Sequence, residues 1–207
     1  MSFRYYKITP LIIIVLVLAG LIDQGINKLI MPMLNKYDIA FLRAPGNAAL
    51  IASFLSLYDK FLWRLPLFNM LVTIPDMRGR YKGKVVYTFQ GTKGDTNCYL
   101  EISQTSSKIK LHSYFQTDGK PDTNSKSLVE NIIEEDGFYY IYLYYLNNGS
   151  KENADLDCHE GANMLKFIPK TVDSNQMLLG HYFTNRKIQT RGKMEAEFKN
   201  RKLKGTF

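Results

Sequence analysis

The residues best suited to hold an anion lie in the last quarter of the chain. In a strand alternate side chains share a face, so Tyr182, Thr184 and Arg186 are expected together, with Thr190 on the next strand. A guanidinium, two hydroxyls and an aromatic ring in one place suit a phosphate diester and a stacked base. The alternative is a strand end whose arginine pairs with an acidic neighbour.

Two further segments offer polar or aromatic groups to the same kind of ligand. Residues 139–145 contain five tyrosines, of which Tyr144 is taken as a stacking surface. Ser125 and Ser127 share one strand face and are candidate hydrogen-bond donors. Packing of the wall of the domain is the alternative for the tyrosines.

Residues that would indicate an enzyme or a metal centre do not form a known pattern. The chain has no P-loop, GxSxG or HExxH motif. His112, His159 and His181 are far apart in sequence. Cys98 and Cys158 fit neither CxxC nor zinc spacing, and their positions neither prove nor exclude a disulfide between them. We therefore expect a non-enzymatic protein without a metal or a resident cofactor.

The elements that position these residues are predicted to be strands. From residue 78 onward apolar and polar residues alternate, and turn residues interrupt the pattern at short intervals. This pattern predicts an eight-stranded antiparallel β-barrel or a sandwich. An eight-stranded barrel encloses packed side chains or one small ligand. The predicted strands cover residues 80–90, 98–103, 109–115, 125–135, 138–146, 157–168, 176–186 and 190–199.

The first 74 of the 207 residues have a different character. The chain carries a net charge of +8, but residues 11–22 are uncharged, and ten of these twelve are Leu, Ile or Val. With the flanking residues they predict a membrane span over about 8–26, preceded by Arg4 and Lys7. The alternative is a cleaved signal peptide, but a small-x-small cleavage site is lacking near Ala19.

A second apolar stretch predicts another span over about 46–68. Residues 48–58 are uncharged, Asp59 and Lys60 interrupt the stretch, and Tyr58 and Trp63 suit a membrane interface. An amphipathic helix on the membrane surface or a core helix are the alternatives. We therefore expect an α-helical transmembrane hairpin at 1–74 and a cytoplasmic ligand-binding barrel at 75–207, with both termini in the cytoplasm because basic residues are slightly richer after the second stretch.

Several segments, in this order along nearly the whole chain, resemble one bacterial family. The chain resembles the two-transmembrane, β-strand-rich effectors of CBASS, the cyclic-oligonucleotide-based anti-phage signalling systems. Tyr81 is a departure, since the family usually has Trp there. The segments that carry the resemblance are residues 59–63, 74–83, 100–105, 125–127, 180–186 and 190–192.

The resemblance implies a function in antiviral defence. A cognate nucleotidyltransferase makes a cyclic dinucleotide, the barrel binds it, the effector forms homo-oligomers, and the helices disrupt the inner membrane so that the cell dies. The anionic partner suggested by the basic charge is then this nucleotide or the lipid bilayer, and not DNA or RNA. The rival interpretation is a membrane-anchored barrel that binds an apolar ligand or has a structural role in the envelope.

Overall fold

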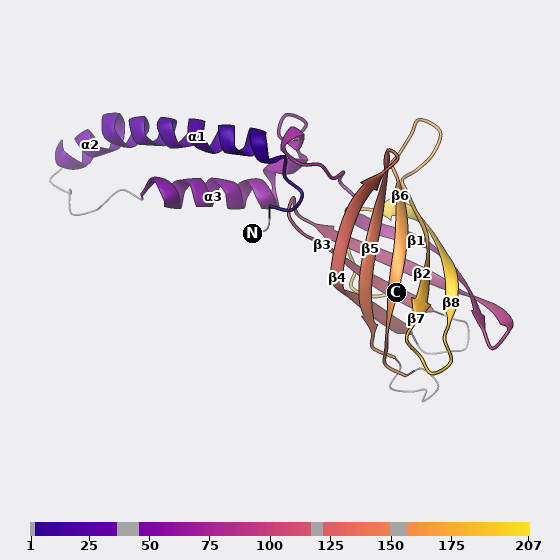
Figure 1. Ribbon diagram of the computed structural model, residues 1–207. Coiled ribbons are helices and arrows are strands. Elements are labelled where there is room, and N and C mark those ends of the chain that lie inside the picture. The colour runs from indigo at the N-terminus through magenta and orange to yellow at the C-terminus, as the bar shows by residue number, and fades with distance from the viewer. Residues whose placement is uncertain (1–2, 37–45, 117–121, 150–156) are drawn as a thin grey trace. The chain divides into compact units, whose positions relative to one another are not determined.

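Helices and strands occupy separate parts of the chain (Figure 1). The computed structural model describes residues 3–36, 46–116, 122–149 and 157–207. The internal contacts divide the chain into one unit of Met1–Pro75 with Thr105–Lys108, and a second of Asp76–Gln104 with Ile109–Phe207. The turn Thr105–Lys108, which joins two strands, therefore groups with the helical unit.

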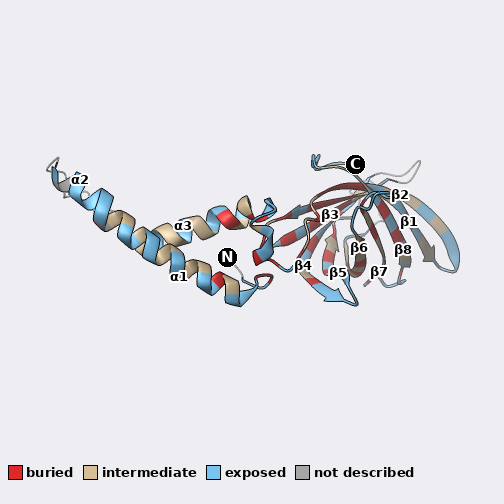
Figure 2. Cartoon of the chain, turned by 90° about the horizontal axis from the view of Figure 1, so that it is seen from above, coloured by how far each residue is buried: buried red, intermediate tan, exposed pale blue. Residues whose placement is uncertain are grey.

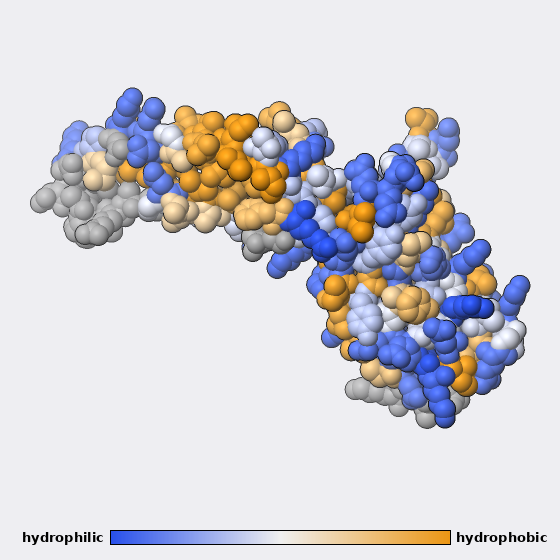
Figure 3. Space-filling view, viewed as in Figure 1, coloured by the Kyte–Doolittle hydropathy of each residue, from blue (hydrophilic) through white to orange (hydrophobic). Residues whose placement is uncertain are grey.

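The helical unit contains one helical stretch, Ile8–Met33, that is long and apolar enough to cross a membrane by length and composition, within the residues described. It is longer than the predicted 8–26, because the helix continues through a π-helical turn. Apolar side chains gather on its surface (Figure 3), and Leu16 and Leu21 are more than half exposed. The elements of the helical unit are α1 (Ile8–Gly25), the π-turn Ile26–Ile30, α2 (Met31–Lys36), α3 (Asn47–Lys60) and the 3-10 turns Leu62–Arg64 and Asn69–Leu71.

The second predicted span differs from the structure. Helix α3 has 14 residues, which rise about 21 Å, less than the ~30 Å of a bilayer core. The helix ends at Lys60, where Phe61 leaves the helical conformation. Leu65 precedes Pro66 and is extended, as a residue before proline prefers, so the helix does not continue to residue 68. A second membrane-spanning helix over 46–68 is therefore not shown.

Asp59, the acidic residue that interrupts the second apolar stretch, has a hydrogen-bond partner in the turn Thr105–Lys108. The Ser106 hydroxyl donates to Asp59 Oδ1 at 2.7 Å, and the Ser106 amide donates to the Asp59 carbonyl at 3.1 Å. Because the Ser106 hydrogen is already donated, the Tyr6 hydroxyl is the donor in its bond to Ser106 Oγ. The three side chains form a hydrogen-bonded chain inside the helical unit.

The second unit is a closed barrel of eight antiparallel strands, each paired with its neighbour in sequence, and β8 closes onto β1. This confirms the predicted eight-stranded antiparallel β-barrel. Buried and exposed residues alternate along the strands (Figure 2). The strands are β1 (Gly79–Phe89), β2 (Thr92–Gln104), β3 (Ile109–Gln116), β4 (Thr123–Glu135), β5 (Phe138–Asn147), β6 (His159–Ile168), β7 (Met177–Thr184) and β8 (Arg191–Asn200).

One half of the barrel interior is packed solid and is called the floor here. It consists of inward side chains that are at most 2% exposed: Tyr81, Ile102, Ile141, Phe167 and Leu178. The Tyr81 hydroxyl donates to the Met77 carbonyl at 2.7 Å and accepts from Gln176 Nε2. Tyr81, the departure from the family pattern, is therefore a fully hydrogen-bonded part of the floor.

Candidate ligand-binding site

The other half of the barrel interior is hollow. A cavity of about 580 Å³ is lined by side chains from all eight strands and from the segment between β7 and β8. This volume lies within the range of about 300–1,000 Å³ for small-molecule sites. The barrel therefore has a solid floor and a chamber that accommodates one small ligand.

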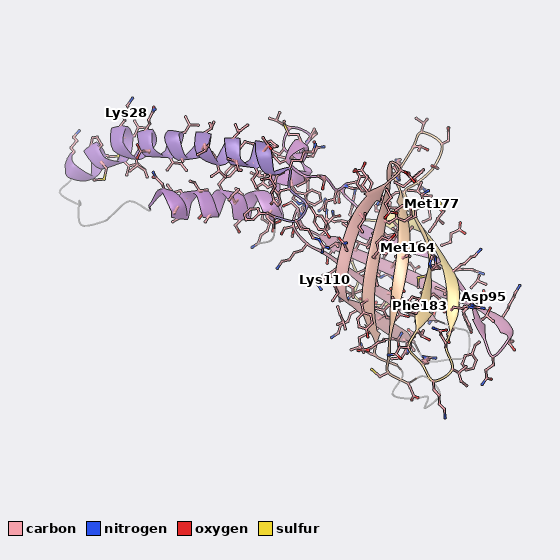
Figure 4. The ribbon with its side chains drawn as sticks, in the orientation of Figure 1. Lys28, Asp95, Lys110, Met164, Met177 and Phe183 are labelled. Atoms are coloured by element: carbon pink, nitrogen blue, oxygen red, sulfur yellow. The ribbon has the colours of Figure 1, made fainter. Side chains whose placement is uncertain are left out.

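Six of the seven predicted ligand residues line this cavity. They are Ser125, Ser127, Tyr182, Thr184, Arg186 and Thr190. Alternation along β7 explains why Tyr182 and Thr184 both face the cavity. Phe183, which lies between them, is on the outer wall (Figure 4) and is half-exposed.

Tyr144, the seventh predicted residue, lies on the outer wall. Its hydroxyl donates to the Glu160 carboxylate, and its side chain is partly exposed. The inward residues of β5 include Ile141, Leu143, Tyr145 and Asn147. Because successive side chains point to opposite faces, Tyr145 rather than Tyr144 faces the cavity.

Three tyrosines of the cavity wall each lie opposite a glycine of the neighbouring strand. The pairs are Tyr87 with Gly94, Tyr145 with Gly161 and Tyr182 with Gly192. A Cβ atom added to any of these glycines would come within 3 Å of the ring opposite. The glycines therefore leave space for the rings to lie flat against the wall, which keeps the centre of the cavity open.

Hydroxyl groups on two sides of the cavity are oriented as donors. Ser125 Oγ accepts from Asn147 Nδ2 at 2.9 Å, and Ser127 Oγ accepts from the Leu111 amide at 2.9 Å. Thr184 Oγ1 likewise accepts from the Thr190 amide at 3.0 Å. A hydroxyl that accepts one bond keeps its hydrogen for another acceptor, so all three can donate to a ligand.

Arg186 is the one permanently charged group among the described residues that line the cavity, and none of these residues is acidic. Its Nη2 donates to His159 Nδ1 at 3.0 Å. The same ring nitrogen lies 2.9 Å from the Asp157 carbonyl oxygen, which only accepts. One proton position cannot satisfy both neighbours, so Nδ1 of a neutral His159 forms a hydrogen bond with only one of them.

The environment of the cavity shifts the pKa of its titratable groups. Burial lowers the pKa of His159, the hydrogen bond from its ring to the Asp157 carbonyl opposes the shift, and the charge of Arg186 adds to it. Burial raises the pKa of Tyr182 to about 12, and nearby Tyr87 adds to this shift. At neutral pH the site therefore offers neutral hydroxyls, a neutral imidazole and one guanidinium.

Three buried polar atoms of the wall lack a hydrogen-bond partner within the described residues. They are Asn163 Oδ1, Arg186 Nε and Thr190 Oγ1. Leaving such atoms without a partner costs free energy, on the order of 1–3 kcal/mol each. They therefore favour a polar, hydrogen-bonding ligand over an apolar one.

Several wall residues were missed by sequence reasoning. Asn147, His159 and Asn163 face the cavity although none was predicted to bind a ligand. A signal was available for Asn163, because it shares its strand face with the apolar Leu165 and Phe167. No group of three metal-ligating side chains is present among the residues whose positions are described.

Comparison with known proteins identifies the family. The family model described as "Cap15, cyclic dinucleotide receptor domain" matches residues 72–197, more than half of the chain. The chain belongs to the Cap15 family. The predicted resemblance to CBASS effectors is thereby confirmed.

Two curated proteins named "CD-NTase-associated protein 15" are relatives of this Cap15 chain. The Escherichia albertii protein is 26% identical over 82% of this chain and 88% of its own length. The Staphylococcus schleiferi protein is 26% identical over 56% of this chain, and this chain spans only 61% of its length. The match to the receptor domain includes all eight strands except the last residues of β8.

Proposed function

We propose that this protein is a CBASS effector whose barrel cavity binds a cyclic dinucleotide made by a cognate nucleotidyltransferase. The observation that carries the proposal is the half-buried Arg186, whose buried Nε has no partner among the described residues, in a cavity lined by donors and without a described acidic residue. A guanidinium in such a setting binds a phosphate diester strongly. The family match supports the same ligand class.

The two phosphates of a cyclic dinucleotide match donors on opposite walls. In a closed eight-stranded barrel, β7 and β8 lie across from β3 and β4. Arg186, Thr184 and Thr190 hold one phosphate from the first wall. Ser125 and Ser127 donate to the second phosphate from the other wall.

The nucleobases are held by aromatic side chains that line the cavity. Tyr87, Tyr145 and Tyr182 line the cavity and lie against their glycine partners, so their exposed ring faces can stack on a base. Stacking of this kind contributes about 1–3 kcal/mol per base and accepts any base. Asn147 and Asn163 supply amide groups that can distinguish the edges of the bases.

The helical unit anchors the protein in the inner membrane and disrupts the bilayer after ligand binding. Ile8–Met33 supplies the span, and the shorter α3 enters the bilayer without crossing it, with its flanking residues 61–68 at the interface. The barrel lies in the cytoplasm, where the nucleotide is made. Binding brings copies together as homo-oligomers, and no chemical step on the ligand is required.

The experiment is a calorimetric titration of the full chain in detergent with cyclic dinucleotides, and with a linear dinucleotide as the comparison ligand. We expect a cyclic ligand to bind and Arg186→Ala to weaken binding more than tenfold. Tyr144→Phe is the matched control, since it removes a hydroxyl from the outer wall. Unchanged affinity of a folded Arg186→Ala protein would reject this site.

The effector activity is tested separately from binding. The full chain in dye-loaded vesicles should release dye only when the cyclic ligand is added, with a parallel increase in particle mass by mass photometry. Binding without release or assembly would reject the membrane-disrupting role and leave the receptor role intact. Tight binding of a fatty acid in place of a nucleotide would favour the rival apolar-ligand function.

A further inference from the structure

Two charged residues on the outer wall of the barrel are almost completely buried. Arg80 on β1 and Glu101 on β2 lie directly opposite each other and form an ion pair. Their positions face away from the interior, yet they are only 1% and 4% exposed. Charged residues are seldom so buried unless they are paired and covered.

The cover is the segment of the chain that follows β8. The amides of Lys204 and Gly205 donate to the two carboxylate oxygens of Glu101 at 2.8 and 3.1 Å. Arg80 Nη1 donates to the Thr206 carbonyl at 2.7 Å. These three contacts all use main-chain atoms of residues 204–206, so the ion pair binds a peptide backbone.

An aromatic residue completes the arrangement. The Arg80 guanidinium lies 3.8 Å from the centre of the Tyr99 ring, and the Phe207 ring meets the same ring edge-on at 5.0 Å. Gly205 has a φ of +75°, a conformation that disfavours any residue with a side chain. The arrangement therefore selects a peptide with glycine two residues before an aromatic residue.

We propose that Arg80, Tyr99 and Glu101 form an exchangeable peptide-binding site, called the tail clamp, whose occupant is the segment 204–207 of the same chain or of a second copy. The occupant lies outside the part of the chain that the receptor-domain match covers, which ends at residue 197. The tail clamp is also outside the ligand cavity, because its members are on the opposite face of the wall from the cavity residues.

Exchange between copies follows from the nature of the contacts. The tail of a second copy makes the same bonds, so the exchange costs little in contact energy. Confinement of several copies in one bilayer raises their local concentration and favours it. This exchange rests on the assembly proposed above, whereas the peptide-binding site does not.

The site is tested with a fluorescein-labelled, amidated peptide of residues 200–207 and a protein that ends at residue 200. We expect saturable binding by anisotropy, and at least tenfold weaker binding of the peptide that carries Gly205→Val. The full chain should also bind the peptide at least tenfold more weakly, because its own tail competes. Absence of saturable binding, or equal binding of the two peptides, would overturn the proposal without depending on the folding of any clamp variant.

The exchange is tested with two tagged copies, one that ends at residue 200 and one with Glu101→Gln and an intact tail. With cyclic ligand in vesicles, we expect the two to co-purify and excess peptide to prevent it. Ligand-induced assembly of tail-less copies alone would overturn the exchange and leave the proposed function standing. Failure of the unaltered full chain to assemble would instead reject the proposed assembly, while the peptide titration still decides the site.

Discussion

The ring of Tyr182 lies against Gly192 in the neighbouring strand, and a Cβ atom at Gly192 would be 2.8 Å from Tyr182 Cε1. The same atom would be 2.3 Å from the Val86 carbonyl oxygen, which belongs to the backbone of β1. Two strands and a cavity side chain therefore meet at a position that only glycine fills.

Alanine at two of these glycines should have different effects. At Gly94 the added Cβ meets only the outer atoms of the Tyr87 ring, which can rotate toward the cavity. Gly94→Ala should therefore leave the melting temperature nearly unchanged and weaken ligand binding.

Gly192→Ala should instead lower the melting temperature, because a backbone oxygen cannot move aside as a ring does. Circular dichroism melts and ligand titrations of both variants check this contrast. Equal loss of stability in the two proteins would contradict it.

The affinity for an anionic ligand should increase as the pH falls from about 8 to 6. Without ligand, burial and Arg186 hold the pKa of His159 below its ordinary value of 6.5. A phosphate that engages Arg186 favours the protonated ring, which then donates to the Asp157 carbonyl, so binding takes up a proton. Titration at several pH values measures this, and His159→Asn should abolish the trend.

His159 also makes folding stability depend on pH. Its pKa is lower in the folded than in the unfolded chain, so the unfolded chain takes up the proton first as the pH falls. Its contribution is present above the ordinary pKa and is lost as the pH falls through the folded pKa. Melts at pH 8 and pH 5 should therefore differ less in His159→Asn than in the unaltered protein.

Glu101→Gln should destabilise the protein by about 3–5 kcal/mol, because it removes the counter-charge of the buried Arg80. The matched control is Asp95→Asn, which removes a carboxylate from the exposed pair Lys84–Asp95. That change should alter stability by less than about 1 kcal/mol. Urea denaturation of the three proteins gives the comparison.

The two cysteines should differ in reactivity toward maleimide. Both are thiols in the described structure, Cys158 exposed and Cys98 buried. Burial raises the pKa of Cys98 to about 12, so its thiolate is scarce at neutral pH. Mass spectrometry should find one label per native chain, on Cys158, and a second only after unfolding.

The sequence was a good guide to the barrel and to most of its cavity. Polar and apolar residues alternate clearly along β1 and β8, which indicates strands, and the two-residue period of a strand places Thr184 on the same face of β7 as Tyr182. The face of Tyr144 could not be predicted in the same way, because residues 138–146 are all apolar or aromatic and show no alternation. Only the register of β5 with β6 places Tyr145 inside.

Other features depend on contacts that sequence spacing does not reveal. Composition indicates where apolar residues run, but it does not mark the end of α3 at Lys60, where Phe61 leaves the helical conformation. The bond between Arg186 and His159 joins residues 27 positions apart. Such pairs arise from strand order and from the path of the segment before β8, which alternation does not determine.

The packed floor closes one end of the barrel interior. Tyr81, Ile102 and Leu178 fill the barrel interior at that end, so a ligand in the cavity cannot leave the barrel through the floor. A conduit needs two openings, whereas a cavity closed at one end admits and releases its ligand by the same end of the barrel.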